Sequence, residues 1–319
     1  MYDEIEIPLD YTNFTWRYAD NGYEWDYNIK VDEMFHEGNY SSPFLIIKPG
    51  ITSYTSTTPF KSSPELFTLF AELPVGDDDE SLKAILNFTN QHGLLNAGLT
   101  MDNSQIDNGI RTYSTIFQGI SLHFYLTQIW EMKNAFRIWN WLQEKNSSTL
   151  SKVIRWTNDD NIQYFFGELE DIDIFSSTGI QYDSNGNCLT DLKGCIIPRS
   201  YKLFDKPQHN VLKKIKKDDY FLPAKFVIQK IINKNLSKYP VKPLLLMDNN
   251  ETLKQFFVPS SLLACMWFQF FQVVTGERKI KQCFYCGKWE NVTDKYSSWK
   301  YHSRCGNYAR VKKYREQTK

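Results

Sequence analysis

The sequence lacks the features that mark exported and membrane-spanning chains. Its first residues, 1–14, contain no basic start followed by an apolar run, so no secretion signal is expected. The longest apolar stretch, 256–274, is interrupted by Pro259, two serines and two glutamines, which predicts a buried helix rather than a membrane span. We therefore expect a cytoplasmic protein without membrane contact, where cysteines tend to be free or metal-bound.

The sequence also lacks the common motifs of nucleotide-binding and hydrolytic enzymes. It contains no G-x-x-x-x-G-K-[ST], no G-x-G-x-x-G and no G-x-S-x-G. The prediction is that the protein is not an enzyme, and catalysis ranks behind two binding functions described below.

Hydrophobic side chains, by contrast, are plentiful. They make up 42% of the 319 residues, with 22 Phe, 19 Tyr and 9 Trp, which excludes general disorder. The patterning predicts an α+β fold, with a predominantly helical body, a small β-rich N-terminal part and a C-terminal zinc-binding module. The expected segments are a β-rich stretch at 1–62, a helical body at 63–276 with a hairpin-rich insertion near 160–205, and the zinc module with a basic helix at 277–319.

Helical periodicity recurs along the body, in two shorter stretches after Ser63 and Asp77 and in three longer ones at 120–145, 207–236 and 262–274. The last is the most apolar, and we expect Pro259, Ser260 and Ser261 to open it and Gly276 to close it. Between the helices at 207–236 and 262–274, Pro240 and Pro243 indicate a connector, and Leu244–Met247 predicts a short buried segment. Two glycines add turn signals, with Gly93 as a helix C-cap and Gly186 in a hairpin turn.

The formal net charge of zero hides an asymmetry along the chain. From Thr275 to Lys319 there are twelve Lys and Arg against four Asp and Glu, so the remaining residues carry a matching acidic excess. A compact basic end suits a polyanion such as nucleic acid. It equally suits docking on the acidic remainder of the protein itself.

Four potential metal ligands lie close together in this basic segment. Cys283 and Cys286 form a C-x2-C knuckle followed by Gly287, and His302 and Cys305 follow as H-x2-C. Zinc favours four thiolate or imidazole ligands in a tetrahedron, and this spacing supplies them. The cofactor expected is a structural zinc ion, because four protein ligands leave no open position for water. The other reading is a reduced knuckle with incidental thiols.

The run after the knuckle resembles the CGNR-type zinc finger, in which C-G-N-R precedes A-K-V-x-R-Y-R or a close variant. Arg310 and Lys313 match that run in charge. The identical positions are Cys305, Gly306, Asn307, Ala309, Val311, Tyr314 and Arg315.

The sequence departs from that family at two places. Tyr308 stands where the family has its first Arg. The family's third ligand is usually a Cys directly after a Trp, but here Trp299 is followed by Lys300, and His302 lies two places further on. Either His302 supplies the ligand after a local shift, or the site is three-coordinate, weak or completed from elsewhere.

A weaker resemblance extends into the body, over 86–95 and 262–270. Both stretches are similar to helices of bacterial proteins described as stress-induced transcription regulators, which are largely helical with a C-terminal zinc module. This resemblance implies regulation and binding to nucleic acid. The partner expected is DNA rather than RNA, although no motif in the sequence distinguishes the two.

The expected nucleic-acid contacts lie in the C-terminal segment, most of them on a basic helix from about Asn307 onward. Tyr301, Tyr308 and Tyr314 either stack on bases or pack on the protein, and the cations either bind phosphates or are merely solvated. The candidate contact residues are Arg304, Arg310, Lys312, Lys313, Arg315 and Lys319.

Two functions from different classes follow. The first is a nucleic-acid-binding regulator, with a ligand or protein partner on the acidic body. The second is a protein–protein adaptor in a stress or phage-defence system, in which the zinc module is only a structural clasp.

Overall fold

The computed structural model describes residues 16–27, 43–48, 53–96, 119–156, 161–164, 195–198, 219–247, 251–296 and 298–317. The chain divides into two compact units, each assembled from separated stretches. The first unit comprises 1–70, 83–123 and 238–319, and the second comprises 71–82 and 124–237. The segment boundaries expected at residues 62 and 276 stay a prediction.

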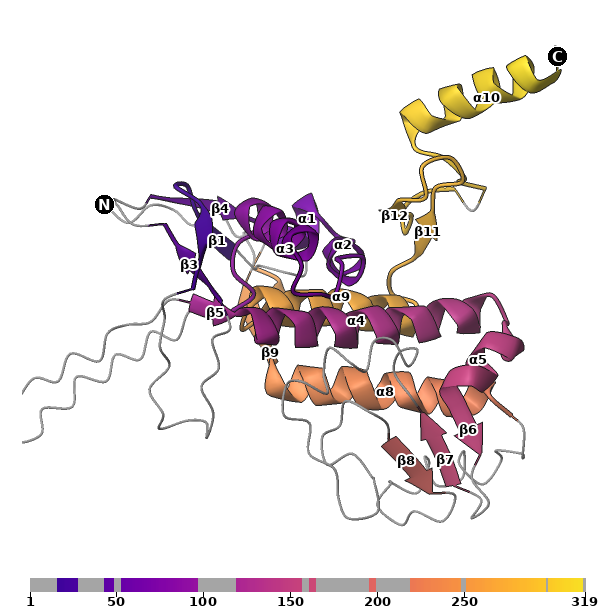
Figure 1. Cartoon of the computed structure of the whole chain (residues 1–319), viewed down its shortest axis with the longest axis horizontal. Helices are drawn as coiled ribbons and strands as arrows, with labels where there is room; N and C mark the ends of the chain where they lie inside the picture. The colour runs from indigo at the N-terminus through magenta and orange to yellow at the C-terminus, as the bar shows by residue number, and fades with distance from the viewer. Residues whose placement is uncertain are drawn as a thin grey trace, which may run out of the picture. The chain divides into compact units, whose positions relative to one another are not determined.

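The fold class predicted from the sequence is confirmed: helices dominate and small antiparallel sheets accompany them (Figure 1). None of the helices in the described residues is long and apolar enough to cross a membrane. The helices are α1 (Pro59–Ser62), α2 (Leu66–Ala71), α3 (Asp79–His92), α4 (Leu122–Gln143), α5 (Ser147–Val153), α8 (Phe221–Lys238), α9 (Leu262–Thr275) and α10 (Ser303–Gln317).

The strands form five small sheets within the described residues, and every pairing is antiparallel. The pairings are β1 with β4, β2 with β3 with β5, β6 with β7 with β8, β9 with β10, and β11 with β12. The strands are β1 (Trp16–Ala19), β2 (Tyr23–Asp26), β3 (Phe44–Ile47), β4 (Tyr54–Thr57), β5 (Gly119–Ser121), β6 (Ile154–Trp156), β7 (Asn161–Tyr164), β8 (Cys195–Pro198), β9 (Val241–Met247), β10 (Leu253–Pro259), β11 (Ile280–Gln282) and β12 (Trp289–Asn291).

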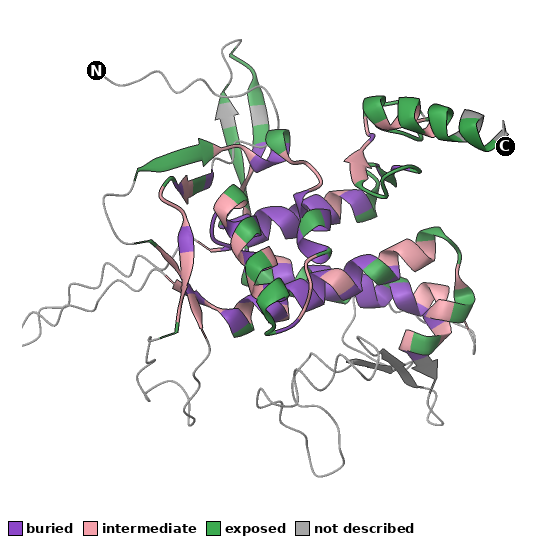
Figure 2. Ribbon diagram, turned by 45° about the horizontal axis from the view of Figure 1, so that its top comes forward, coloured by how far each residue is buried: buried purple, intermediate pink, exposed green. Residues whose placement is uncertain are grey.

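Helix α9 forms the core of the first unit, and Figure 2 shows it buried along most of its length. The Ser261 side chain caps its first turn by accepting a hydrogen bond from the Ala264 N–H at 3.0 Å. Gly276 ends the helix in the left-handed conformation, at a φ of 85°. The helix and its end at Gly276 are as predicted, and of the three residues expected to open it, Ser261 is the cap.

A buried glutamine ties α9 to the short helices before it. The Gln269 side chain donates to the Ser63 carbonyl at 2.9 Å and accepts from the Phe67 N–H at 3.4 Å. Its amide thereby gives the Phe67 N–H in the first turn of α2 a hydrogen-bond partner, and it adds a second donor to the Ser63 carbonyl, which also accepts from the Leu66 N–H at 3.0 Å.

Helix α3 ends as predicted at Gly93, which has a φ of +91°. A Cβ atom there would lie 2.7 Å from the Trp16 indole nitrogen, so only glycine fits. The last helical residue, His92, packs its ring on Phe88 at 4.8 Å between centroids.

In the second unit, α4 and α8 are linked by charge. Glu131 is buried in α4 and pairs with Lys234 of α8 at 3.4 Å, while Lys133 donates to the Leu73 carbonyl at 2.7 Å. The observed bounds fall inside the predicted 120–145 for α4. For the helix predicted at 207–236, the described part begins at Asp219. The prediction of an unbroken helix is wrong at 219–220, because these two residues are not helical and α8 begins at Phe221, whose N–H donates to Asp219 Oδ1 at 2.9 Å.

The hairpin-rich insertion predicted near 160–205 is described only in part. Strands β7 and β8 pair within it, with Ile162 opposite Ile197. The hairpin turn predicted at Gly186 lies outside the described residues.

The prediction of a connector and a buried segment around Pro243 is wrong. These residues form strand β9, paired with β10, and Leu244, Leu245 and Met247 are 44%, 65% and 58% exposed. In a two-stranded sheet each strand has one free edge, where a proline's missing N–H costs no ladder hydrogen bond. Burial depends on a covering layer, which an apolar run alone does not specify.

Candidate metal centre

The first half of the site is a tight turn between two short strands. Cys283 follows β11, Cys286 ends the turn, and the chain returns through β12. Gly287 adopts a φ of +72° and donates its N–H to the Cys283 carbonyl at 2.9 Å. The hairpin therefore holds both thiols of the C-x2-C knuckle near one point.

The second half comes from the start of α10. His302 directly precedes this helix, Cys305 lies in its first turn, and the His302 carbonyl accepts from the Gly306 N–H at 3.0 Å. The expected helix start near Asn307 is thus wrong, because α10 begins at Ser303 and takes Gly306 into the helix. The two halves are joined by the Phe284 N–H, which donates to the Lys300 carbonyl at 3.0 Å.

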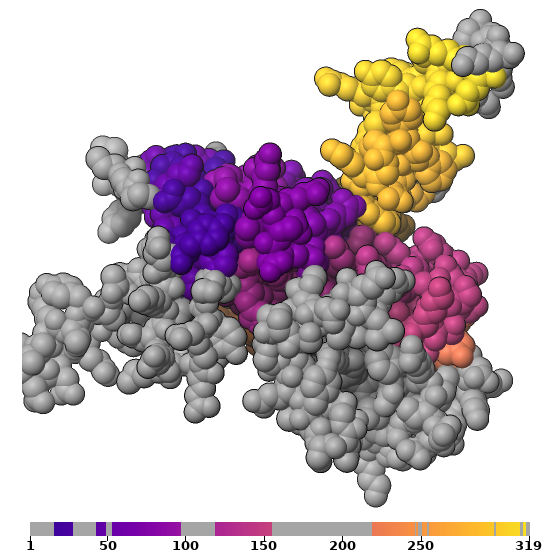
Figure 3. All heavy atoms as spheres, in the orientation of Figure 1, coloured from indigo at the N-terminus to yellow at the C-terminus, as the bar shows by residue number. Residues whose placement is uncertain are grey.

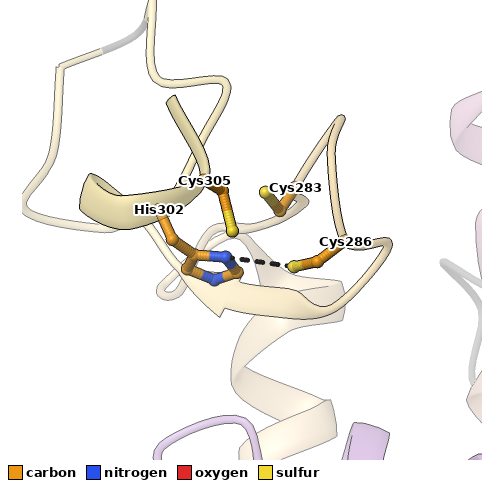
Figure 4. Close-up of side chains that lie close together, drawn as sticks. All are labelled: Cys283, Cys286, His302 and Cys305. Atoms are coloured by element: carbon orange, nitrogen blue, oxygen red, sulfur yellow. Dashed lines mark hydrogen bonds between the residues drawn. The ribbon is translucent and has the colours of Figure 1, made fainter. Parts of the chain in front are cut away.

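The four predicted ligand residues converge (Figure 4). The sulfur atoms of the three cysteines and a ring nitrogen of His302 all lie within 4.8 Å of one another. Around a tetrahedral zinc ion with bonds of about 2.3 Å, sulfur atoms are about 3.8 Å apart. The Cys286 Sγ and His302 Nδ1 atoms are already 3.3 Å apart. A small contraction of this Cys3His group would enclose a metal ion.

The thiols influence one another's ionisation. Burial favours the neutral form of the Cys283 thiol, but hydrogen bonds from three backbone N–H groups and from Cys286 outweigh it and lower its pKa to about 6. Burial, together with hydrogen bonds to Cys286 and Cys283, raises the pKa of Cys305 to about 11. The cluster thus shares protons among its sulfur atoms, and a bound cation would displace them.

A carboxylate orients the histidine from outside the cluster. Glu290 of β12 places Oε2 3.1 Å from His302 Nε2 and also pairs with Lys295 through its other oxygen. A carboxylate only accepts, so Nε2 donates to it, and Nδ1, which faces the thiols, is the ring nitrogen available to a metal ion. The Trp299 ring also packs edge-on against the His302 ring, with 5.4 Å between the two ring centroids.

Neither Glu290 nor Lys295 was identified from the sequence. The one available signal was that Glu290 is among only four acidic residues in a basic segment. Its role depends on the hairpin, which places Glu290 opposite Lys281 and beside the later His302.

The predicted phosphate contacts are separate from the metal cluster and lie along α10, most of whose side chains are exposed (Figure 2). Arg304, Lys312 and Arg315 are exposed, and Arg310 is exposed while bonding to Asn307 Oδ1 at 3.1 Å. Lys313 lies within α10. The remaining predicted contact, Lys319, lies outside the described residues.

Comparisons of the chain with protein-family models, with curated proteins and with solved structures found no match. The resemblance to CGNR-type zinc fingers rests on the residues quoted above and stays a prediction.

Proposed function

We propose that this protein is a nucleic-acid-binding regulator whose C-terminal module holds a structural zinc ion and presents a basic helix to DNA. The observation that carries the proposal is that Cys305 belongs both to the Cys3His cluster and to the first turn of α10. A metal ion there would fix the start of a helix whose exposed side chains include Arg304, Lys312 and Arg315.

Zinc is the proposed metal because of the donor set. Three thiolates and one imidazole suit zinc, and four protein ligands leave no position for a reacting water. The proposed role of the metal is therefore structural, and the role of the protein is binding rather than catalysis.

The charge of the module supports nucleic acid as the partner. Residues 275–319 carry twelve basic against four acidic side chains, an excess that favours polyanions. The resemblance to stress-induced transcription regulators supports DNA and a regulatory role. Each phosphate that the helix neutralises should add about −0.9 to the slope of log affinity against log salt.

The test is binding of the zinc-loaded protein to a random-sequence DNA duplex at several salt concentrations. We expect binding at low salt that weakens steeply as salt is raised. The triple substitution Lys312→Glu, Lys313→Glu and Arg315→Glu should abolish it, whereas Lys242→Glu, an exposed cation of β9, should have little effect. Absent binding at low salt, or binding unchanged in the triple variant, would refute the proposal.

Metal analysis tests the zinc site separately. We expect close to one zinc per chain, and His302→Ala should lower this content. Unchanged zinc in that variant would remove His302 from the ligand set and leave a three-cysteine site.

A second candidate function is a protein–protein adaptor in a stress or phage-defence system, with the zinc module as a clasp. The β9–β10 hairpin favours it, because Leu245, Met247 and Leu253 are exposed large apolar side chains on one face of the hairpin, and Leu244 is exposed on the other. A protein that ignores nucleic acid but loses a protein partner upon Leu245→Glu would support this alternative.

A further inference from the structure

A hollow of about 350 Å³ lies where the knuckle meets α10. Figure 3 shows the knuckle and α10 as adjoining groups of orange and yellow atoms. We call this hollow the tyrosine pocket. Its lining residues are Tyr285, Tyr308, Val311, Lys312, Arg315 and Glu316.

Two of the residues that line the pocket are aromatic. The rings of Tyr285 and Tyr308 lie 5.9 Å apart between centroids and are inclined by only 20°. This separation belongs to the offset stacked arrangement, in which each ring keeps part of its face uncovered. Tyr285 remains 45% exposed and Tyr308 61% exposed. Two parallel aromatic faces are thus held in place yet stay accessible to a flat partner.

The other residues that line the pocket have apolar or charged side chains. On α10, Val311 and Arg315 follow Tyr308 at intervals of three and seven residues, and Lys312 follows at four, so all four share one helix face. Glu316 adds a carboxylate beside these cations. An aromatic surface flanked by cations is suited to a flat ring that carries an attached anion.

We propose that the tyrosine pocket binds an unpaired nucleobase, so that the preferred ligand is single-stranded nucleic acid. This inference rests on the proposed nucleic-acid function and specifies its ligand. A base stacks on the exposed ring face of Tyr308, because every base presents such a face whatever its sequence. A duplex buries the faces of its bases in the helical stack and offers only their edges.

The charged side chains of the pocket make the remaining contacts with the ligand. Lys312 and Arg315 attract the phosphates on either side of the stacked base, while Glu316 repels them and so confines the backbone to the cationic side. The Glu316 carboxylate accepts a hydrogen bond from the amino group of cytosine, adenine or guanine.

The experiment uses the full-length zinc-loaded protein and a labelled cytosine-rich 20-nucleotide strand, measured by fluorescence anisotropy beside the same strand annealed to its complement. We expect the single strand to bind more tightly. Tyr308→Leu should weaken single-strand binding by about 5-fold to 150-fold and leave duplex binding nearly unchanged. Tyr308→Phe keeps the ring face and should retain single-strand binding.

A matched control and the contrary results complete the test. Tyr296, which is 90% exposed and lies outside the pocket, should tolerate Tyr296→Leu without effect. If the duplex binds as tightly as the single strand and Tyr308→Leu binds normally, the pocket inference is wrong while the proposed function stands. If neither nucleic acid binds at low salt, both fail.

Discussion

Glu290 contacts the edge of the His302 ring that faces away from the three thiols. It thereby sets which ring nitrogen is free to bind a metal. Such outer carboxylates raise the basicity of a histidine ligand and fix its orientation. Glu290 also holds Lys295, whose ammonium group lies 5.6 Å from the centre of the Trp299 ring. The Glu290 side chain thus connects the β11–β12 hairpin with Lys295 and with His302, the candidate metal ligand.

We therefore expect Glu290→Ala to weaken metal binding about 10-fold to 100-fold, the usual loss for such a partner. Glu290→Gln should have a smaller effect, because its amide oxygen still accepts from Nε2. Competition with a chromophoric zinc chelator measures both affinities. Glu277→Ala, an exposed acid of the same module, is the control, and an equal loss in this variant would attribute the effect to charge alone.

At His92 the side chain is half-buried against Phe88, and burial lowers its pKa. The unfolded chain then binds more protons than the folded chain near the ordinary histidine pKa of about 6.5, so stability falls as the pH drops below that value. In the His92→Gln variant, the free energy of unfolding measured in urea should fall less than in the wild type as the pH drops from about 6.5 to 5. A variant that shifts stability equally at every pH would contradict this assignment.

At the scale of the element, α9 is defined largely by its own sequence. Its apolar run, the opening stretch 259–261 and the final Gly276 are local signals, and all three predicted the observed helix. Local capping and periodicity do not depend on where the rest of the chain lies.

Ser261→Ala should accordingly destabilise the protein by about 0.5–2 kcal/mol, because the Ala264 N–H loses its partner. Chemical denaturation gives the free energy of unfolding. The neighbouring Ser260 is exposed and makes no cap, so Ser260→Ala should change stability little. Equal losses in both variants would exclude the cap as the cause.

Elements that depend on distant partners were predicted less well. The start of α10 was placed near Asn307, yet the helix begins at Ser303, beside the cysteine cluster. Similarly, the apolar residues around Leu245 indicated burial, although the strand they form has a single neighbour. The metal-site residues were predictable because their spacing is a local pattern, whereas Glu290 required the folded hairpin.

At the scale of the whole molecule, the basic charge and the candidate metal ligands both concentrate in the last part of the chain. Residues 275–319 contain the basic excess and the Cys3His cluster. Helix α9, directly before them, is stabilised by the burial of its own apolar side chains. Loss of a structural metal should therefore unfold the module before the core helices.

Chelation should make the module sensitive to protease while the core helices stay protected. Trypsin added with a strong chelator should cut first after Lys279, Lys281 or Lys288, as mass spectrometry of the fragments would show. Excess zinc should suppress these cuts. Equal cleavage rates with and without chelator would mean that the module is held together without metal.

Cys305 lies within the first turn of α10. Under the proposed zinc site, helix formation and metal capture are then a single equilibrium. The fraction of molecules with an ordered α10 rises with the free zinc concentration, following the mass-action relation between ligand and folded state. The zinc concentration in the cell would in this way set how many protein molecules have an ordered α10 and hence ordered basic side chains. The structural ion would then also make the protein respond to the zinc concentration.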